Sequence, residues 1–482
     1  MTGTTHDAAR PAPDRPWARD VVGPRTKGLR LPAGTTVADV LAGSPRVTDG
    51  AFSWPLLTLD DAALDHNVGT VARVCAERGV EHAPHVKTTM SRALYARQAA
   101  AGAWGATVAT PSQLRTVRDW GVPRVLLANE LLDPREIEWL RDDLARAEAA
   151  GGDDEVWLCA DSPHGVDLLA RGFADAPAAV RARLGVLVEL GVPGGRTGVR
   201  STAAALDLAR ALRASGLRLL GATGYEGSVA GGTTADELAA VGAWCDGLRE
   251  LGAAFVREGL AGVDEPLVLS AGGSSFLDVV LAGLPGPVPG PDGREVEVRV
   301  VVRSGAYVTH DHGFYSRTDP WSRIPGAEPL RAAATVWGQV LSVPEPGLAV
   351  CGIGRRDVSF DIDLPVALWL RSQSDDGWLA PRELAGTRVT ALNDQHLYLA
   401  LDADEAGAGQ VGGPATAQVR PGDVVGFGIS HPCTTFDRWR VAAVVRGDEV
   451  VVRATRARWP TPTPPHEPPP AGAGAQGRAP AR

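Results

Sequence analysis

Lysine is almost absent from this chain of 482 residues. It occurs only as Lys27 and Lys87, and the other 46 of the 48 basic residues are arginine. Arginine keeps its positive charge at any working pH, whereas lysine can lose its proton and become a nucleophilic amine. Two lysines must fall somewhere by chance. A lysine retained in such a composition is nevertheless a candidate for chemistry that arginine cannot perform.

Cysteine is scarce as well, with five residues spread over positions 75, 159, 245, 351 and 433. An odd number of distant cysteines is typical of reduced thiols and not of a disulfide framework, so we expect a cytoplasmic protein. Long apolar runs are missing, which excludes a membrane-spanning helix. The first 17 residues carry acidic side chains and no apolar core, so we expect no secretory signal there.

Clusters of basic residues are also absent. The net charge is −9 and the arginines are scattered, so we expect no nucleic-acid partner. A hydrophobic fraction of 44% with 22% charged residues is ordinary for a chain with a large core. At about 150 residues per domain, the length predicts roughly three domains, or one large barrel with a smaller partner.

Short apolar runs alternate with helical patterns up to about residue 304. Val/Leu runs of this kind are typical of parallel strands covered by helices. Eight of them predict an α/β fold with a (β/α)8 barrel over residues 59–304. The seventh crossover, near 274–296, is short and the least regular. The runs cover residues 80–87, 105–110, 124–129, 156–161, 184–190, 218–226, 266–273 and 298–305.

After residue 305 the pattern changes to β-type alternation between Gly, Pro and Asp turns. Such segments at 335–343, 366–370, 387–401 and 440–454 predict a mostly β domain over residues 305–458. Residues 26–58 contain an apolar segment, AFSWPLLT, that we expect to pair with this domain. The two ends, 1–25 and 459–482, are rich in Pro, Ala and Gly and are predicted to be mobile tails.

Polar residues stand at the carboxyl ends of the predicted strands, where barrel enzymes keep their chemistry. Lys87 ends the first strand, and Thr88–Ser91 are expected to open a helix. An amine there can form a Schiff base if burial or a nearby charge lowers its pKa. The turn LSAGGSS (269–275) offers backbone N–H groups that can cradle a phosphate. Together they suggest pyridoxal 5′-phosphate, although a Gly-Gly turn alone is usually only a turn.

A second glycine-rich segment, ELGVPGGRTGVR (189–200), follows the fifth run. Glycines allow the backbone to approach a flat ligand, and Arg196 would then lie over the barrel mouth. A guanidinium against a pyridine nitrogen would keep that nitrogen unprotonated. The alternative interpretation is a surface loop with a solvated arginine.

These motifs, with GYEGS (224–228) and RSGAYVTHDHGFY (303–315), resemble the alanine-racemase-type, fold type III pyridoxal phosphate enzymes. The D-serine dehydratase and D-threonine aldolase group is the most similar branch, and the resemblance covers about residues 50–445. It implies a barrel followed by a β domain, a head-to-tail homodimer and Lys87 as the cofactor lysine. It also implies Arg196 near the pyridine nitrogen, Tyr225 near the substrate, and a phosphate surrounded by Ser270, Gly272, Gly273 and Ser274.

The segment GISHPCTTFDRW (428–439) places His431 and Cys433 on either side of a proline. Imidazole and thiolate are a suitable pair for zinc, although an isolated His-x-Cys is more often structural. In the family that the chain resembles, this position carries a divalent metal. Aldolases have His-x-Asp there and dehydratases have His-x-Cys, so Cys433 favours a zinc-dependent dehydratase.

Further histidines and cysteines are assigned other roles. His310 and His312 flank Asp311 and would point to opposite faces of a strand, so a structural or supporting role is favoured over a metal cluster. His396 could orient a ligand. The four cysteines other than Cys433 lie in helical or strand patterns and are predicted to be core residues.

Four functions remain open. The first is a pyridoxal phosphate- and zinc-dependent dehydratase that converts a D-3-hydroxy amino acid such as D-serine to a 2-oxo acid and ammonia. In it, Lys87 takes the α-proton and the metal assists loss of the hydroxyl. The second is a metal-dependent D-threonine aldolase. A non-catalytic cofactor-carrying barrel and a plain racemase are further alternatives, but neither uses the His-Pro-Cys motif.

Overall fold

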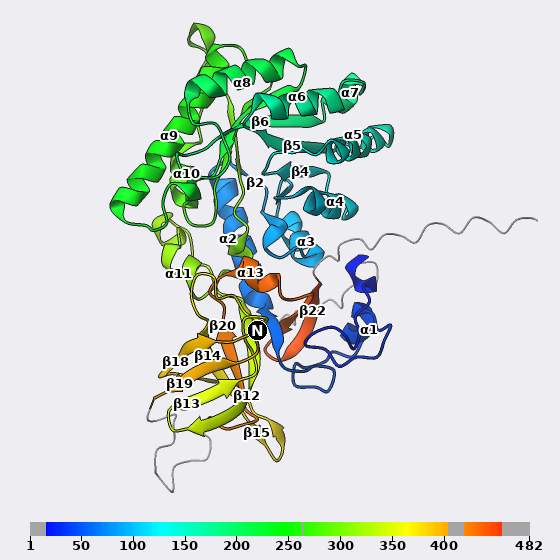
Figure 1. Ribbon diagram of the computed structural model, residues 1–482, viewed down its shortest axis with the longest axis vertical. Helices are drawn as coiled ribbons and strands as arrows, with labels where there is room; N and C mark the ends of the chain where they lie inside the picture. Colours follow the sequence, from blue (N-terminus) through cyan, green and yellow to red (C-terminus); the bar gives the residue numbers. More distant parts are fainter. Residues whose placement is uncertain (1–15, 263–264, 403–418, 456–482) are drawn as a thin grey trace, which may run out of the picture.

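The computed structural model describes residues 16–262, 265–402 and 419–455. Two bodies follow one another along its long axis, a helix-covered barrel and a mostly β domain (Figure 1). Within the described residues, no helix combines the length and apolarity needed to cross a membrane. The predicted segments 1–15 and 459–482 lie outside the described residues.

The barrel is an eight-stranded parallel sheet with the order β2-β11-β8-β7-β6-β5-β4-β3. A parallel bridge between His85 and Thr107 joins the two ends of this order. The predicted α/β barrel is thereby confirmed, and each of the eight apolar runs contains one strand. The strands are β2 (Glu81–His82), β3 (Ala106–Val108), β4 (Arg124–Leu127), β5 (Glu155–Ala160), β6 (Leu184–Leu190), β7 (Arg218–Gly224), β8 (Leu267–Ala271) and β11 (Val298–Val302).

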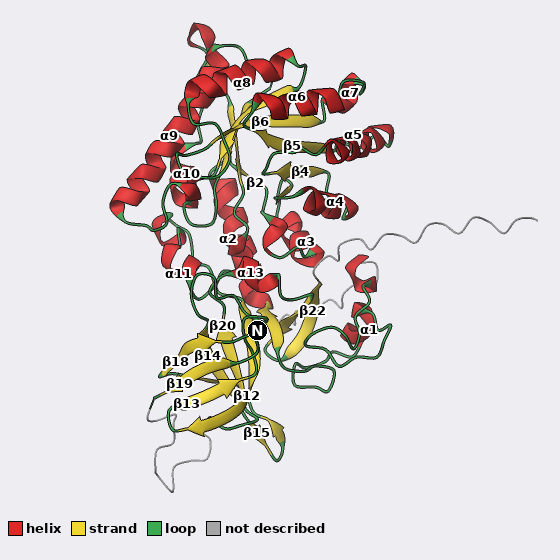
Figure 2. Ribbon diagram, viewed as in Figure 1, coloured by secondary structure: helices red, strands yellow, loops and turns green. Residues whose placement is uncertain are grey.

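The helices around the barrel begin at polar caps. At seven of them an Asp, Ser or Thr side chain accepts a backbone N–H of the first turn, a contact that stabilises a helix by about 1 kcal/mol. Figure 2 shows these helices around the strands. They are α2 (Asp61–Glu77), α3 (Arg92–Ala100), α4 (Pro111–Asp119), α5 (Pro134–Ala149), α6 (Pro163–Gly172), α7 (Ala178–Arg181), α8 (Thr202–Ala214), α9 (Ala235–Arg257) and α10 (Leu277–Gly283).

The seventh crossover is irregular, as the sequence suggests. After the short helix α10 it continues through a hairpin of β9 (Val288–Pro289) and β10 (Glu295–Val296). Inside the barrel, one buried side chain from each of several strands forms a separate apolar cluster around Trp157. The barrel is therefore a packed core, and its polar chemistry is confined to the strand ends.

The second domain contains a 10-stranded sheet with the central order β17-β14-β20-β12-β1-β21-β22. Its strands are β1 (Leu56–Asp60), β12 (Ala334–Glu345), β13 (Leu348–Cys351), β14 (Val366–Arg371), β17 (Arg382–Glu383), β18 (Thr387–Leu392), β19 (Leu397–Leu401), β20 (Val424–Gly428), β21 (Val441–Arg446) and β22 (Glu449–Thr455). The described part of this domain also contains a small hairpin, β15 (Gln373–Ser374) and β16 (Gly377–Trp378), and the helices α1 (Val37–Ala42), α11 (Phe314–Thr318) and α13 (Pro432–Phe436).

The sheet is built from both ends of the chain. β1 pairs antiparallel with β12 and parallel with β21. Residues 16–25, which the sequence places in a mobile tail, instead form a 3-10 turn and pack Ala18 and Val22 into a small apolar cluster with β21. The segment is ordered because these two buried side chains pack against β21. Its Pro- and Ala-rich composition does not indicate this contact.

Candidate active site

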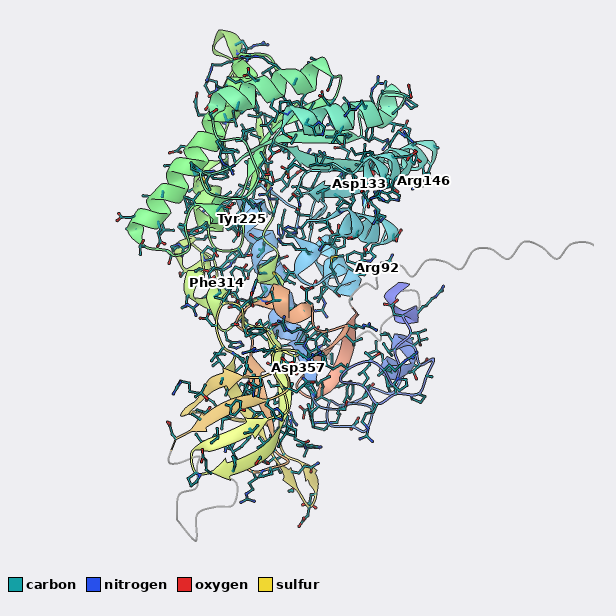
Figure 3. The ribbon with its side chains drawn as sticks, in the orientation of Figure 1. Arg92, Asp133, Arg146, Tyr225, Phe314 and Asp357 are labelled. Carbon is teal, nitrogen blue, oxygen red and sulfur yellow. The ribbon has the colours of Figure 1, made fainter. Side chains whose placement is uncertain are left out.

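A cavity of about 540 Å³ opens at the carboxyl ends of the barrel strands, against α13 of the second domain. Its size is within the range of small-molecule and cofactor sites. Figure 3 labels Tyr225 in the barrel, Phe314 below it and Asp357 in the second domain, which marks the region between the two bodies. The lining includes His85, Lys87, Thr88, Asn129, Arg196, Thr197, Tyr225, Gly273, Ser274, Arg303, Gly305, Ala306, Tyr315, His431 and Cys433.

Lys87 opens to this cavity from a 3-10 turn, Val86–Thr88, and not from the strand end itself. The following helix begins at Arg92, after Ser91 as its cap. Burial lowers the pKa of Lys87; the Cys433 thiolate opposes this change, and the charges of Arg196 and Arg303 add to it. The neutral, nucleophilic form of the amine is thus favoured relative to a solvated lysine.

His431 and Cys433 meet the same cavity from the start of α13. Pro432 takes the first helical position, where a missing N–H costs nothing. Cys433 Sγ lies 3.4 Å from Thr88 Oγ1, so the motif reaches the residue that follows Lys87. Although burial opposes the change, hydrogen bonds from His431 and Thr88 and the positive charges nearby lower the pKa of Cys433. A thiolate is the form that binds metal.

The ring of His431 is fixed from its other side. Its Nδ1 lies 2.7 Å from Asp361 Oδ2, and Thr434 donates to the second carboxylate oxygen at 2.7 Å. Burial lowers the pKa of His431, but hydrogen bonds and charge from Cys433 and Asp361 outweigh it and raise the pKa to about 9. Asp361 lies 70 residues before the histidine, so no spacing in the sequence indicates this contact.

The donor set fits an open metal site. Across the residues described here, no three or more His, Cys, Asp or Glu side chains converge on one metal position. His431 and Cys433 therefore form a pair. One imidazole and one thiolate are fewer than the four ligands of a closed structural zinc site and one fewer than the three protein ligands usual at a catalytic zinc. They leave coordination positions for water or substrate.

Arg196 and Tyr225 also come together at the cavity. The guanidinium carbon of Arg196 lies 4.6 Å from the centre of the Tyr225 ring, and its Nη2 is 3.8 Å from Glu189 Oε1. A cation over an aromatic face contributes about 0.5–1 kcal/mol when exposed. Burial raises the pKa of Tyr225, so the phenol keeps its proton. Arg196 therefore contacts Glu189 and Tyr225, and its side chain remains 49% exposed.

The glycine-rich turn after β8 differs from the sequence expectation. The N–H groups of Gly272 and Gly273 donate to the buried carboxylate of Glu226, at 3.1 and 2.5 Å. Ser270 is fully buried and donates to the carbonyl of Val301 at 2.9 Å. Only Gly273 and Ser274 of the four predicted residues line the cavity. The two glycine amides are committed to Glu226, which a sequence pattern does not reveal.

Other lining residues take the place of these amides. Ser274 follows β8, and Gly305 and Ala306 follow β11, the seventh and eighth strands of the barrel. Loops after these two strands are where barrel enzymes commonly hold a phosphate. Arg303 lies beside them, fixed by bonds to Thr223 Oγ1 and the carbonyl of Gly224. These residues are the ones of the lining that could meet a phosphorylated ligand, whereas Gly272 does not line the cavity.

Residues 310–312 do not form a strand, although the sequence-based prediction placed His310 and His312 on opposite faces of one. They follow a 3-10 turn, and His310 has a positive φ of 49°. Asp311 accepts the backbone N–H groups of Gly313 and Tyr315 at 2.9 and 3.0 Å. It thereby fixes the start of α11 and the position of Tyr315, which lines the cavity. His396 is exposed in the turn between β18 and β19.

The assignment of four cysteines to the core is confirmed. Cys75, Cys159, Cys245 and Cys351 are buried and free, and Cys433 is the partly exposed one. Of the remaining lining residues, Thr88, Tyr315 and Arg303 were not assigned a role from the sequence. Arg303 is one of the polar residues that the sequence places at the carboxyl end of a predicted strand, and β11 indeed ends at Val302.

Two family comparisons match the two bodies. The family described as "Alanine racemase, N-terminal domain" matches residues 59–258. The family described as "Putative serine dehydratase domain" matches residues 333–445. The first match covers the barrel through α9 and stops before β8 and β11, and the second covers the part of the β domain that carries His431 and Cys433.

Among curated proteins, the chain is similar to a 3-hydroxy-D-aspartate aldolase of Paracoccus denitrificans, with 26% identity over 347 residues, 69% of this chain and 80% of that protein. Among solved structures, a D-threonine aldolase from Filomicrobium marinum has 24% identity and a TM-score of 0.66, covering 84% of this chain and 96% of that one. A D-threo-3-hydroxyaspartate dehydratase from Delftia sp. HT23 has 22% identity and a TM-score of 0.61, covering 84% and 97%.

Proposed function

The chain belongs to the alanine-racemase-like, fold type III pyridoxal phosphate enzymes, and we propose that it is a zinc-dependent dehydratase of D-3-hydroxy amino acids. D-Serine is the simplest such substrate and would give pyruvate and ammonia. The observation that carries the proposal is the placement of His431 and Cys433 in the same cavity as Lys87, with Cys433 next to Thr88.

Pyridoxal phosphate would supply an electron sink for the electrons left on the α-carbon when its proton departs. Lys87 would hold the cofactor covalently, since its amine opens to the cavity and its pKa is lowered by burial. Arg196 would face the pyridine nitrogen. Gly273 and Ser274 would meet the phosphate, with Ser270 and Gly272 supporting their turn from behind.

Zinc bound by His431 and Cys433 would supply a Lewis acid for a leaving hydroxyl, a contribution of several kcal/mol to the transition state. The thiolate favours zinc over magnesium or manganese, which prefer oxygen ligands. A solved structure similar to this chain is a D-threo-3-hydroxyaspartate dehydratase in which a cysteine is replaced by alanine, in a metal-free form. This likeness supports a metal at His431 and Cys433 in the present chain.

The chain's own groups would then divide the proton transfers. Lys87 Nζ, released when the substrate amine takes its place on the cofactor, would take the α-proton. Tyr225, which keeps its own proton, would lie near the substrate. Loss of the α-proton and the β-hydroxyl amounts to loss of water and leaves an enamine. Addition of water to that enamine releases ammonia and the 2-oxo acid.

A metal-dependent aldolase is the second candidate, because two of the similar proteins are aldolases of D-threonine and 3-hydroxy-D-aspartate. In that reaction the Cα–Cβ bond breaks, giving glycine and an aldehyde. A racemase or a cofactor carrier remains less favoured, because neither gives His431 and Cys433 a role.

Product analysis on D-serine, D-threonine and D-3-hydroxyaspartate, with and without a chelator, tests the proposal. Ammonia and a 2-oxo acid, lost on chelation, are expected. Glycine with an aldehyde would identify an aldolase, the L-isomer a racemase, and no turnover a carrier.

We also propose a cytoplasmic homodimer. The five cysteines are free, in keeping with a reducing compartment. Phe360, Ile362 and Leu364 are 40%, 41% and 38% exposed on a segment beside the cavity, where a second copy would cover them. Analytical ultracentrifugation of the purified protein should give twice the chain mass of 50.3 kDa.

A further inference from the structure

The carboxylate of Asp361 contacts the ring of His431 and the hydroxyl of Thr434. Its Oδ2 lies 2.7 Å from Nδ1 of His431, and its Oδ1 accepts from the hydroxyl of Thr434 at 2.7 Å. An ionised carboxylate can only accept hydrogen bonds, so Nδ1 of His431 must carry the proton. The other ring nitrogen, Nε2, is then the one with a lone pair to offer when the ring is neutral.

The backbone next to the ring is fixed too. The N–H of His431 donates to Ser359 Oγ at 3.1 Å, and Ser359 lies two residues before Asp361. The hydroxyl of Ser430 in turn donates to the carbonyl of Asp363 at 2.7 Å. The segment 359–363 therefore holds both the main chain and the ring of the histidine, which limits the directions that Nε2 can take.

We propose that Asp361 is a positioning residue that orients His431 and fixes its tautomer, so that Nε2 is presented to a zinc ion shared with Cys433. This inference rests on the proposed function, because it needs zinc at that pair. Groups that orient a metal-bound histidine in this way typically change metal affinity about 10–100-fold when they are removed.

Asp363 provides a matched control. It lies two residues further along the same segment and is similarly exposed, at 37% against 38% for Asp361. Its carboxylate pairs with Arg317 at 2.6 Å and not with a histidine. Removing either carboxylate takes the same charge from the same neighbourhood, so a difference between the two variants isolates the contact with His431.

The experiment measures zinc affinity by competition with a chromogenic chelator in the full-length protein. We expect Asp361→Ala to bind zinc about 10–100-fold more weakly than the unchanged protein, and Asp363→Ala to bind within about twofold. Asp361→Asn should lose less than Asp361→Ala, because its amide oxygen can still accept from Nδ1. Asp361→Ser, whose side chain is too short to reach the ring, replaces the alanine variant if that one does not fold.

Three outcomes would overturn the inference. Equal zinc affinity of Asp361→Ala and the unchanged protein would show that the contact has no bearing on the metal. An equal loss in Asp361→Asn and Asp361→Ala would show that the acceptor oxygen toward Nδ1 of His431 is not what supports zinc binding. An unchanged protein that binds no zinc at all would reject the metal part of the proposed function, and this inference with it.

Discussion

The two lysines have different surroundings, although the sequence treats them alike. Lys27 is committed to a structural contact: its Nζ lies 2.9 Å from the carbonyl of Arg356, 3.0 Å from Asp357 Oδ1 and 4.1 Å from the centre of the Trp439 ring. Lys87 instead lines the cavity. The scarcity of lysine thus leaves two candidates for the reactive amine. The fold shows that only Lys87 of the two lines the cavity.

Borohydride reduction of the protein with its cofactor should therefore fix the label on Lys87. Peptide mass mapping measures the site, and a label on Lys27 would contradict the assignment. Lys87→Arg should fold with an unchanged circular dichroism spectrum but carry no label, because a guanidinium cannot form the covalent link.

Removal of the metal, or of Cys433, should abolish ammonia release without removing the cofactor. A Lewis acid at the leaving group contributes several kcal/mol, so turnover of D-serine should fall by at least about a hundredfold in Cys433→Ala. The absorbance of the bound cofactor should persist, since Lys87 holds it separately. Full turnover in this variant, or in the chelated protein, would rule out the metal mechanism.

A carboxylate at the same position would test the choice between the two reactions. Cys433→Asp replaces a soft ligand by a hard one, so we expect preference to shift toward manganese. Some glycine and aldehyde should then form from D-threonine, which chromatography of the products would detect.

At the scale of elements, the sequence predicts the strands and helix starts, because these depend on residues close together in the chain. Eight apolar runs each contain a barrel strand, because parallel strands buried on both faces need continuous apolar residues. The helix boundaries follow from Ser201 and Thr234, which cap α8 and α9. Contacts between residues far apart in the sequence cannot be predicted from such local patterns. The acceptor of the Gly272 N–H is Glu226, 46 residues away, and Asp361 reaches His431 across 70 residues.

The carboxylate of Glu226 should shape the phosphate side of the cavity. Glu226→Gln keeps one acceptor oxygen but places an amide N–H₂ against a backbone N–H, which costs about 1–3 kcal/mol. We expect the affinity for pyridoxal phosphate to fall about tenfold, the equivalent of about 1.4 kcal/mol, and the affinity for pyridoxal without phosphate to change little. Absorbance titrations of the cofactor-free protein measure both.

Glu237→Gln is the control for this measurement. Glu237 also accepts two backbone N–H groups, from Gly232 at 2.9 Å and Thr234 at 3.0 Å, but in a turn outside the cavity lining. It should leave both affinities unchanged. Equal losses of pyridoxal and pyridoxal phosphate binding in Glu226→Gln would mean that Glu226 stabilises the barrel and has no particular effect on the phosphate.

At the scale of the whole molecule, buried histidines link stability to pH. Burial lowers the pKa of His82 from 6.5 to about 4, and its Nε2 lies 3.0 Å from the carbonyl of Ser304. Between these two pH values the unfolded chain binds a proton that the folded protein does not. The free energy of unfolding should therefore fall as pH drops from 6.5 to 4, by about 3 kcal/mol for this residue.

Denaturant titrations across that pH range measure the effect. His82→Gln, which keeps an N–H donor for Ser304, should show a shallower decline than the unchanged protein. An identical slope in both proteins would contradict the role of His82. His312, whose pKa burial also lowers to about 4, should retain its share of the decline in either case.

The pairing of β1 has a consequence for synthesis on the ribosome. All eight barrel strands have been made by residue 302, but β1, made before them, needs β12 and β21 as its neighbours. Translation proceeds from the amino terminus, so one edge of this strand has no partner until β12 ends at residue 345, and the other edge has none until β21 ends at residue 446. An unpaired edge of Leu-Leu-Thr-Leu is a template for another nascent chain. Aggregation in the cell should thus be decided during elongation, and a ribosome that stalls after the barrel releases a polypeptide with Lys87 but without His431 and Cys433.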